Sequence, residues 1–238
     1  MNGGDEMTFP FNENTLVKDI VNIMPKAADL FKKKRIDYCC GGGIPLIHAA
    51  QERKVDLEEL MKELTYIYEA ENHGKEDLKV WTDSDSITIV QHIQERYHEP
   101  LKEELTNLSP YVTKVARVHG GNHPELLKVH ELFFHFKREM LEHTIKEEEQ
   151  VFPLLLSLNK PNVENRDQII AQIHELEKEH DVTGYLLKQL REVTSDYQFP
   201  EDACNTFRLV YKRLEKLEEE TFMHVHLENN ILFPRYLD

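Results

Sequence analysis

Two segments in the C-terminal half of the chain repeat one pattern of histidine, glutamate, phenylalanine and proline. One segment begins at His143 and the other at His224, and in both a glutamate follows by four residues (Glu147 and Glu228) and a Phe-Pro pair by nine and ten. Side chains four residues apart lie on the same face of a helix. The repeat therefore predicts two helices that each present an imidazole and a carboxylate side by side.

Two further histidines repeat in the same way. His98 and His180 are each followed by an acidic residue, and each has a leucine seven residues later. Their spacing along the chain nearly equals the spacing of the two His-Glu segments. The chain thus contains two equivalent halves, and each half supplies one histidine and then a His-Glu pair.

The two repeated glutamates fall on the apolar stripes of their predicted helices. A buried carboxylate without a partner costs several kcal/mol, so Glu147 and Glu228 need a cation. No lysine or arginine lies on these stripes. The pattern therefore predicts a metal site.

Helix geometry tests whether the six side chains can meet. With a rise of ~1.5 Å per residue in antiparallel helices, His98, His143, His180 and His224 lie about 18, 21, 26 and 14 Å above one end of the bundle. One layer can hold all of them, whereas His119 lies ~30 Å from His98 and is excluded. Four imidazoles and two carboxylates suit two ions, with the carboxylates bridging. A ligand set without thiolate favours iron or manganese, with zinc as an alternative.

Long helices must position this layer. Beyond Gly121 the chain contains one glycine, Gly184, so its C-terminal half has few places to turn. Short connections between long helices predict an all-α fold, an up-down-up-down four-helix bundle. We expect helices over about 86–119, 124–159, 163–195 and 201–236, with a turn at 160–165.

The first 73 residues differ from the rest. Short amphipathic segments surround the loop DYCCGGG, which runs from Asp37 to Gly43. A polar stretch follows. We therefore predict a small helical domain over 1–73, a linker over 74–85 and the bundle over 86–238.

The loop also carries two adjacent cysteines. Its glycines let backbone N–H groups converge just before the helix that Pro45 opens, and a helix N-terminus stabilises a thiolate. Cys39 and Cys40 are therefore candidate reactive thiols of low pKa. In the alternative reading, one cysteine packs and the glycines only turn the chain.

The remaining cysteine and several histidines are expected to have structural or solvent-exposed roles. Cys204, alone on the fourth helix, is predicted to pack inside the bundle. His92, His135 and His226 fall off the apolar stripes, so we expect solvent to surround them.

Composition excludes several classes of function. With 44 acidic and 29 basic residues, the net charge of −15 repels nucleic acids and anionic membranes. No apolar run approaches the ~18 residues of a membrane span, and the first residues lack the basic segment of a signal peptide. Three cysteines form no even disulfide framework, which fits a reducing compartment. We therefore expect a cytoplasmic protein.

Four short motifs in combination resemble a known family. The motifs RYH, HTIKEE, EHD and LENNILFP contain the six residues named above. The bundle resembles hemerythrin-like di-iron domains, and residues from about 15 to 236, including DYCCGGG, resemble the di-iron iron–sulfur cluster repair proteins. The resemblance implies a non-haem centre of two iron ions with the same six ligands: His98, His143, Glu147, His180, His224 and Glu228.

Oxygen-carrying hemerythrins resemble the chain less. They have a second histidine four residues after the third-helix ligand, where this chain has Gly184, and their last carboxylate comes one residue later than Glu228. These departures imply irons that are more weakly held or more open, which suits reactivity or iron release.

The resemblance implies repair of iron–sulfur clusters damaged by nitric oxide or peroxide. The partners would be iron–sulfur proteins with damaged clusters, with NO and O2 as further candidate ligands and a homodimer left open. Iron donation, aided by Cys39 and Cys40, and direct chemistry on NO both fit the residues. A di-iron NO reductase or oxidase and an O2 or NO sensor are the alternatives, so the sequence leaves open whether the protein is an enzyme.

Overall fold

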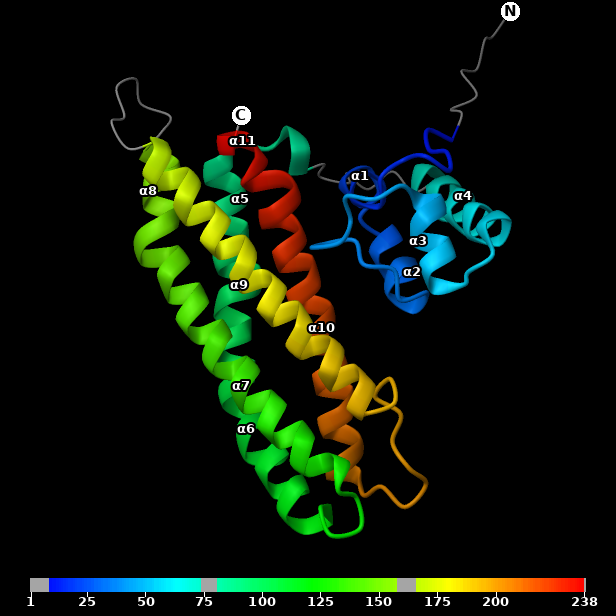
Figure 1. Cartoon of the computed structure of the whole chain (residues 1–238), viewed down its shortest axis with the longest axis vertical. Helices are drawn as coiled ribbons and strands as arrows, with labels where there is room; N and C mark the ends of the chain where they lie inside the picture. The colour runs from blue at the N-terminus through cyan, green and yellow to red at the C-terminus, as the bar shows by residue number, and fades with distance from the viewer. Residues whose placement is uncertain (1–8, 74–80, 158–165, 238) are drawn as a thin grey trace, which may run out of the picture. The chain divides into compact units, whose positions relative to one another are not determined.

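The chain folds into helices throughout the part that the computed structural model describes, which is residues 9–73, 81–157 and 166–237. It divides into two compact units, Met1–Ser84 and Asp85–Asp238. Figure 1 shows both units along the chain. In the described ranges, no helix is both long enough and apolar enough to cross a bilayer.

The described part of the first unit contains the short helix η1 (Trp81–Asp83) and four α-helices around its own apolar core. The α-helices are α1 (Val17–Ile23), α2 (Ala27–Lys33), α3 (Leu46–Arg53) and α4 (Leu57–His73). Ile20, Phe31 and Leu60 are fully buried among them. Asp56 caps α4, because its carboxylate accepts a hydrogen bond of 2.8 Å from the backbone N–H of Glu59.

The second unit is a bundle of four antiparallel rods, and three of the rods consist of several helical segments. The first rod comprises α5 (Ser86–Ile93), η2 (Gln94–His98) and α6 (Glu99–His119). The second comprises α7 (Glu125–Lys146), η3 (Glu147–Val151) and α8 (Phe152–Ser157). The third is α9 (Arg166–Val193), and the fourth comprises α10 (Asn205–Leu227), η4 (Glu228–Leu232) and α11 (Pro234–Leu237).

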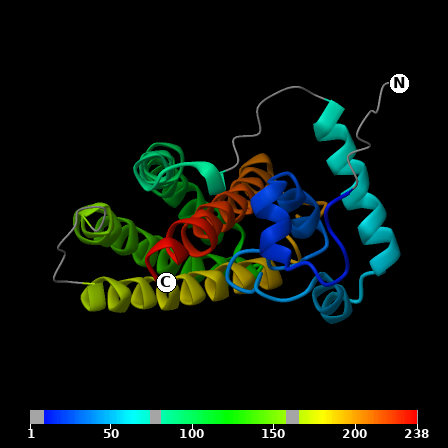
Figure 2. The same cartoon turned by 90° about the horizontal axis from the view of Figure 1, so that it is seen from above.

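The rods alternate in direction, as Figure 1 shows, and Figure 2 shows the same rods from one end. Helix α7 packs against α6 and α9, and α10 packs against α6. Buried apolar side chains fill the interior away from the His/Glu residues, among them Leu105, Phe136, Leu187 and Leu214. The predicted all-α fold with a four-helix bundle is confirmed.

Helix boundaries differ from the expectation at the last connection. Helix α9 ends at Val193, and residues 195–197 after it form a turn with positive φ angles of 49°, 62° and 56°. The fourth rod begins at Asn205, four residues later than expected. The turn expected at 160–165 and most of the linker expected over 74–85 lie outside the described residues.

Candidate metal centre

The bundle brings the six predicted ligands into one buried layer. His98 ends η2, His143 lies near the end of α7, and His180 lies within α9. His224 lies near the end of α10, while Glu147 and Glu228 begin η3 and η4. All six side chains are buried. We call them the His/Glu layer.

The four histidines of the layer form two pairs. The Nε2 atoms of His98 and His224 lie 2.9 Å apart, and so do those of His143 and His180. Each pair joins two different rods. Two ring nitrogens this close together can both bind one cation that lies beside them.

The two glutamates lie between the histidine pairs. Glu147 directs Oε1 toward Nε2 of His143 at 3.2 Å and Oε2 toward Nε2 of His98 at 3.4 Å. Glu228 directs Oε1 toward Nε2 of His224 at 2.9 Å and Oε2 toward Nε2 of His180 at 3.2 Å. Each carboxylate therefore faces both histidine pairs, as a bridging ligand would.

Two overlapping four-residue groups result, and they share both glutamates. In one group the ligand atoms of His98 and His224 and of the glutamates lie within 4.8 Å of one another, and the other group contains His143 and His180 instead. Both oxygens of Glu147 and Oε2 of Glu228 are buried without a hydrogen-bond partner of ordinary geometry. Orphaned buried oxygens beside imidazole nitrogens fit two bridged cations.

Three of the four rods widen into a π-helical turn at the layer. The turns are η2, η3 and η4, and in the last of them the N–H of Phe233 donates to the carbonyl of Glu228 at 2.8 Å, five residues back. Rod α9 continues as an α-helix. Such turns insert one extra residue and are frequent at functional sites.

A proline follows each π-helical turn at the same offset. Pro100, Pro153 and Pro234 each stand two residues after the last residue of a turn, and α9 contains no proline. Proline has no N–H to donate, so the helical hydrogen-bond ladder is already interrupted there. Pro110 lies inside α6 without a π turn, so proline permits the change without forcing it. A proline two residues after the turn is the sequence signal that could have located these turns.

Residues outside the layer hold three of its four histidines. Nδ1 of His98 lies 2.8 Å from Glu148, and Nδ1 of His143 lies 2.8 Å from Glu179. We call Glu148 and Glu179 the outer carboxylates. Lysines pair with both, Lys102 at 2.7 Å and Lys146 at 2.7 Å. A carboxylate on Nδ1 keeps the proton there and leaves Nε2 free to bind a metal.

The other two histidines differ from each other. Nδ1 of His180 lies 2.7 Å from the side-chain oxygen of Asn229. Within the described part of the chain, Nδ1 of His224 is buried without a hydrogen-bond partner. Sequence reasoning missed all of the outer residues, because most are close to their histidines only in space.

Electrostatics in the metal-free layer favours cations. Burial opposes the charged form of His98, but its contact with Glu147 and the outer carboxylate Glu148 raises its pKa to about 11. Burial likewise opposes the charge of His143, yet Glu147 raises its pKa to about 10. The pKa of Glu228 falls well below its ordinary value despite burial, because of the neighbouring histidines. Metal ions entering the layer would therefore replace protons.

The cysteine loop differs from the expectation of a lowered thiol pKa. Cys39 is buried, and its Sγ lies 3.9 Å from that of Cys40 and 3.4 Å from the carboxylate of Asp37. Hydrogen bonding to Cys40, burial and the charge of Asp37 all raise the pKa of Cys39. The predicted low-pKa thiolate is therefore wrong for Cys39.

The backbone of the loop also differs from the expectation that its N–H groups converge, because its carbonyl groups make the hydrogen bonds to a helix. The carbonyls of Gly42 and Ile44 accept hydrogen bonds of 2.9 and 3.1 Å from the N–H groups of Lys18 and Val17, at the start of α1. A side chain at position 42 would lie 2.4 Å from the Tyr38 carbonyl, which explains the glycine. The loop thus caps a helix through its carbonyls.

Two other expectations are wrong. Cys204 is exposed at the N-terminus of α10, with Sγ 3.2 Å from Nε2 of His119, and does not pack inside the bundle. His226 is buried, because the last turn of α10 is covered on all sides. His135 is exposed as expected, and His92 is half-buried beside the Tyr97 ring.

Comparisons with known proteins agree with this architecture. The hemerythrin HHE cation binding domain family matches residues 90–236, and the ScdA_N family, a domain of unknown function (DUF542), matches residues 13–68. The second unit is therefore a hemerythrin-type, cation-binding helical bundle.

Similar proteins align along nearly the whole chain. It is 46% identical over 222 residues to the iron-sulfur cluster repair protein ScdA of Staphylococcus haemolyticus, covering 93% of this chain and 97% of that protein. It is 34% identical over 216 residues to the iron-sulfur cluster repair protein YtfE of Escherichia coli, covering 90% and 92%. The chain belongs to the family of iron–sulfur cluster repair proteins.

Proposed function

We propose that this protein repairs damaged iron–sulfur clusters by supplying iron from the His/Glu layer. One observation carries the proposal: two buried groups of two histidines each share both glutamates, Glu147 and Glu228. That arrangement suits two cations held as a bridged pair. The relatives named for cluster repair supply the biological context.

The donor set favours iron over other metals. Imidazole and carboxylate without thiolate is the ligand chemistry of non-haem iron, and manganese and zinc are the alternatives. Four imidazoles and two shared carboxylates supply each ion with four protein ligand atoms. Further coordination positions would stay open for water or an incoming ligand, so the cargo can exchange.

The targets we infer are cytoplasmic iron–sulfur proteins whose clusters have been damaged by nitric oxide or oxidants. Cys39 and Cys40 are proposed to assist delivery. Thiolates are the usual ligands of iron–sulfur clusters, and the sulfur atoms of Cys39 and Cys40 lie 3.9 Å apart, close enough for one iron to bind both once the buried Cys39 becomes exposed. The raised pKa of Cys39 means that an incoming iron would have to displace its proton.

The decisive experiment combines the iron-loaded protein with an iron–sulfur enzyme inactivated by nitric oxide. We expect the enzyme to regain activity while the bundle loses iron in matching amount. Glu147→Leu should abolish recovery. Glu149→Leu, which replaces an exposed glutamate two residues later in the same segment, should not. Recovery that is equally fast with the metal-free protein would overturn the proposal.

The same assay separates the other readings. A Cys39→Ser, Cys40→Ser double variant should keep its iron and repair more slowly, and full repair by it would leave the loop a structural turn. Steady consumption of NO with a reductant, without iron loss, would instead identify a di-iron NO reductase. Reversible gas binding without iron loss would identify a sensor.

A further inference from the structure

The two halves of the His/Glu layer are unequally supported. In one half, His143 and His180 each have an oxygen acceptor on Nδ1, at 2.8 and 2.7 Å. In the other half, His98 has such an acceptor, but Nδ1 of His224 is buried without a hydrogen-bond partner among the residues that the structure describes. Loss of an outer hydrogen bond to a metal-binding histidine typically weakens metal binding ~10–100-fold. The His98/His224 half is therefore the weaker of the two.

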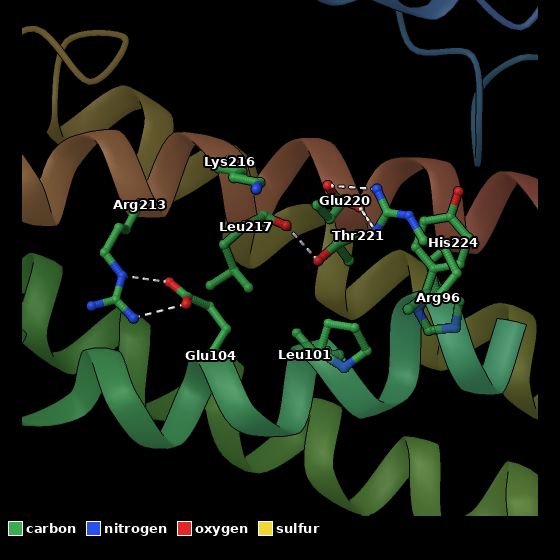
Figure 3. A pocket seen from close by; sticks show the side chains of 11 residues that line it. Arg96, Leu101, Glu104, Arg213, Lys216, Leu217, Glu220, Thr221 and His224 are labelled. Carbon is green, nitrogen blue, oxygen red and sulfur yellow. Dashed lines mark hydrogen bonds and ion pairs between the residues drawn. The ribbon is translucent and has the colours of Figure 1, made fainter.

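A cavity reaches the layer at this weaker half. It has a volume of about 310 Å³ and lies between the first rod, at η2 and α6, and α10, as Figure 3 shows. Of the six residues of the layer, His224 is the one that lines it. The histidine with the unsupported ring thus borders an open space large enough for a hydrated cation.

An ion pair joins η2 to α10 across this cavity near His224. The guanidinium of Arg96 donates two hydrogen bonds to Glu220, at 2.8 and 3.0 Å. Tyr97, next to Arg96, stacks on the His224 ring with centroids 5.9 Å apart. The Arg96 and Glu220 side chains are 51% and 31% exposed, and exposed ion pairs of this kind are weak. The pair can therefore open readily.

Opening the pair would change the charge beside His224. Glu220 lies one helical turn before His224 on α10, so its freed carboxylate becomes a ligand on the path of a departing cation. Arg96 would move its positive charge away from the same path. A second pair, Arg213 with Glu104 at 2.7 and 2.8 Å, lines the cavity about 10 Å from Glu220 along α10, on the side away from His224.

We propose that the iron held by His98 and His224 is the exchangeable one, and that it leaves through this cavity when the Arg96–Glu220 pair opens. The inference rests on the proposed function, in which the layer holds two irons. The step is ligand exchange without change of oxidation state. An external chelator takes the ferrous ion, and the freed imidazoles and carboxylates take up protons from solvent.

The test is iron release from the reduced protein under anaerobic conditions, with excess ferrozine as the ferrous chelator. We expect two kinetic phases of one iron each. Glu148→Gln, which weakens the support of His98, should accelerate the fast phase about tenfold and leave the slow phase unchanged. Glu179→Gln, which weakens the support of His143, should accelerate only the slow phase.

Two matched arginine variants test the cavity. Arg96→Gln should accelerate the fast phase about two- to fivefold, because the ion pair between Arg96 and Glu220 is lost. Arg213→Gln removes the same charge from the far part of the cavity and should leave both phases unchanged. Equal acceleration by the two variants would overturn the proposal that iron leaves when the Arg96–Glu220 pair opens.

The outcomes separate this inference from the proposed function. Release of both irons in one phase, or acceleration of the fast phase by Glu179→Gln, would overturn the inference while two bound irons remain. A protein that binds no iron at the layer would overturn the proposed function itself.

Discussion

Replacing Glu147 with leucine removes one carboxylate oxygen from each of the two ligand groups at once. Its Oε1 faces His143 at 3.2 Å and its Oε2 faces His98 at 3.4 Å. Each group would shrink from four protein ligands to three. Leucine suits the buried position, since Val151 and Phe152 nearby are also buried. We therefore expect loss of metal from a bundle that still folds.

The size of the loss follows from the number of contacts removed. Changes to outer residues alone typically weaken metal binding ~10–100-fold. Removal of a direct ligand at both sites should cost at least ~100-fold, or about 2.8 kcal/mol. In the metal-free variant, His98 and His143 lose the carboxylate that raises their pKa values. The cost to stability stays below ~3–5 kcal/mol, because these imidazolium ions can release their protons.

The assay measures bound iron by mass spectrometry after dialysis against a competing chelator, together with helix content by circular dichroism. Glu149→Leu is the matched control, because Glu149 is an exposed glutamate in the same π-helical turn. Wild type and control should retain two irons per chain, whereas Glu147→Leu should retain well under one. A variant that keeps two irons at nearly wild-type affinity would refute the reasoning.

Four further outcomes are expected. Arg191→Met should lower the free energy of unfolding in urea by about 3–5 kcal/mol, because it removes the guanidinium bound to buried Glu218. Hydrogen bonds from their histidines lower the pKa of the outer carboxylates Glu148 and Glu179 from the ordinary value of 4.5 to about 2. These carboxylates should therefore stabilise the metal-free protein fully above about pH 4.5, and the stabilisation should be lost as the pH falls toward 2. Iodoacetamide followed by peptide mass spectrometry should modify exposed Cys204 before buried Cys39, whose pKa is raised, and the reverse order would contradict this burial. His119→Ala should keep two irons, because His119 lies ~30 Å from His98 along the rod, and loss of one iron would show a different fold of that rod.

The architecture of the bundle could be predicted because it depends on local patterns. Apolar residues at helical spacing identify the rods, and scarce glycine leaves few turns. The four-residue offset from His143 to Glu147, repeated at His224 and Glu228, places imidazole and carboxylate on one helix face. The height of each residue along its rod then follows from the helical rise.

The π-helical turns were only partly accessible to such reasoning. The proline two residues after each turn stands in the sequence, but Pro110 shows that a proline within a rod does not by itself produce one. Packing between rods decides where the backbone takes up an extra residue. That packing involves residues far apart in the chain.

The sequence by itself determined the all-α bundle and the six candidate ligands, because both depend on spacing within single helices. Only the tertiary structure decided which side chains support those ligands. Glu148 reaches His98 across 50 residues of chain, whereas no described residue forms a hydrogen bond with Nδ1 of His224. It also decided that Cys39 is buried and Cys204 exposed. The burial of a side chain and its hydrogen bonds to other helices depend on how separate helices pack together. Helical periodicity describes one helix at a time and carries no information about that packing.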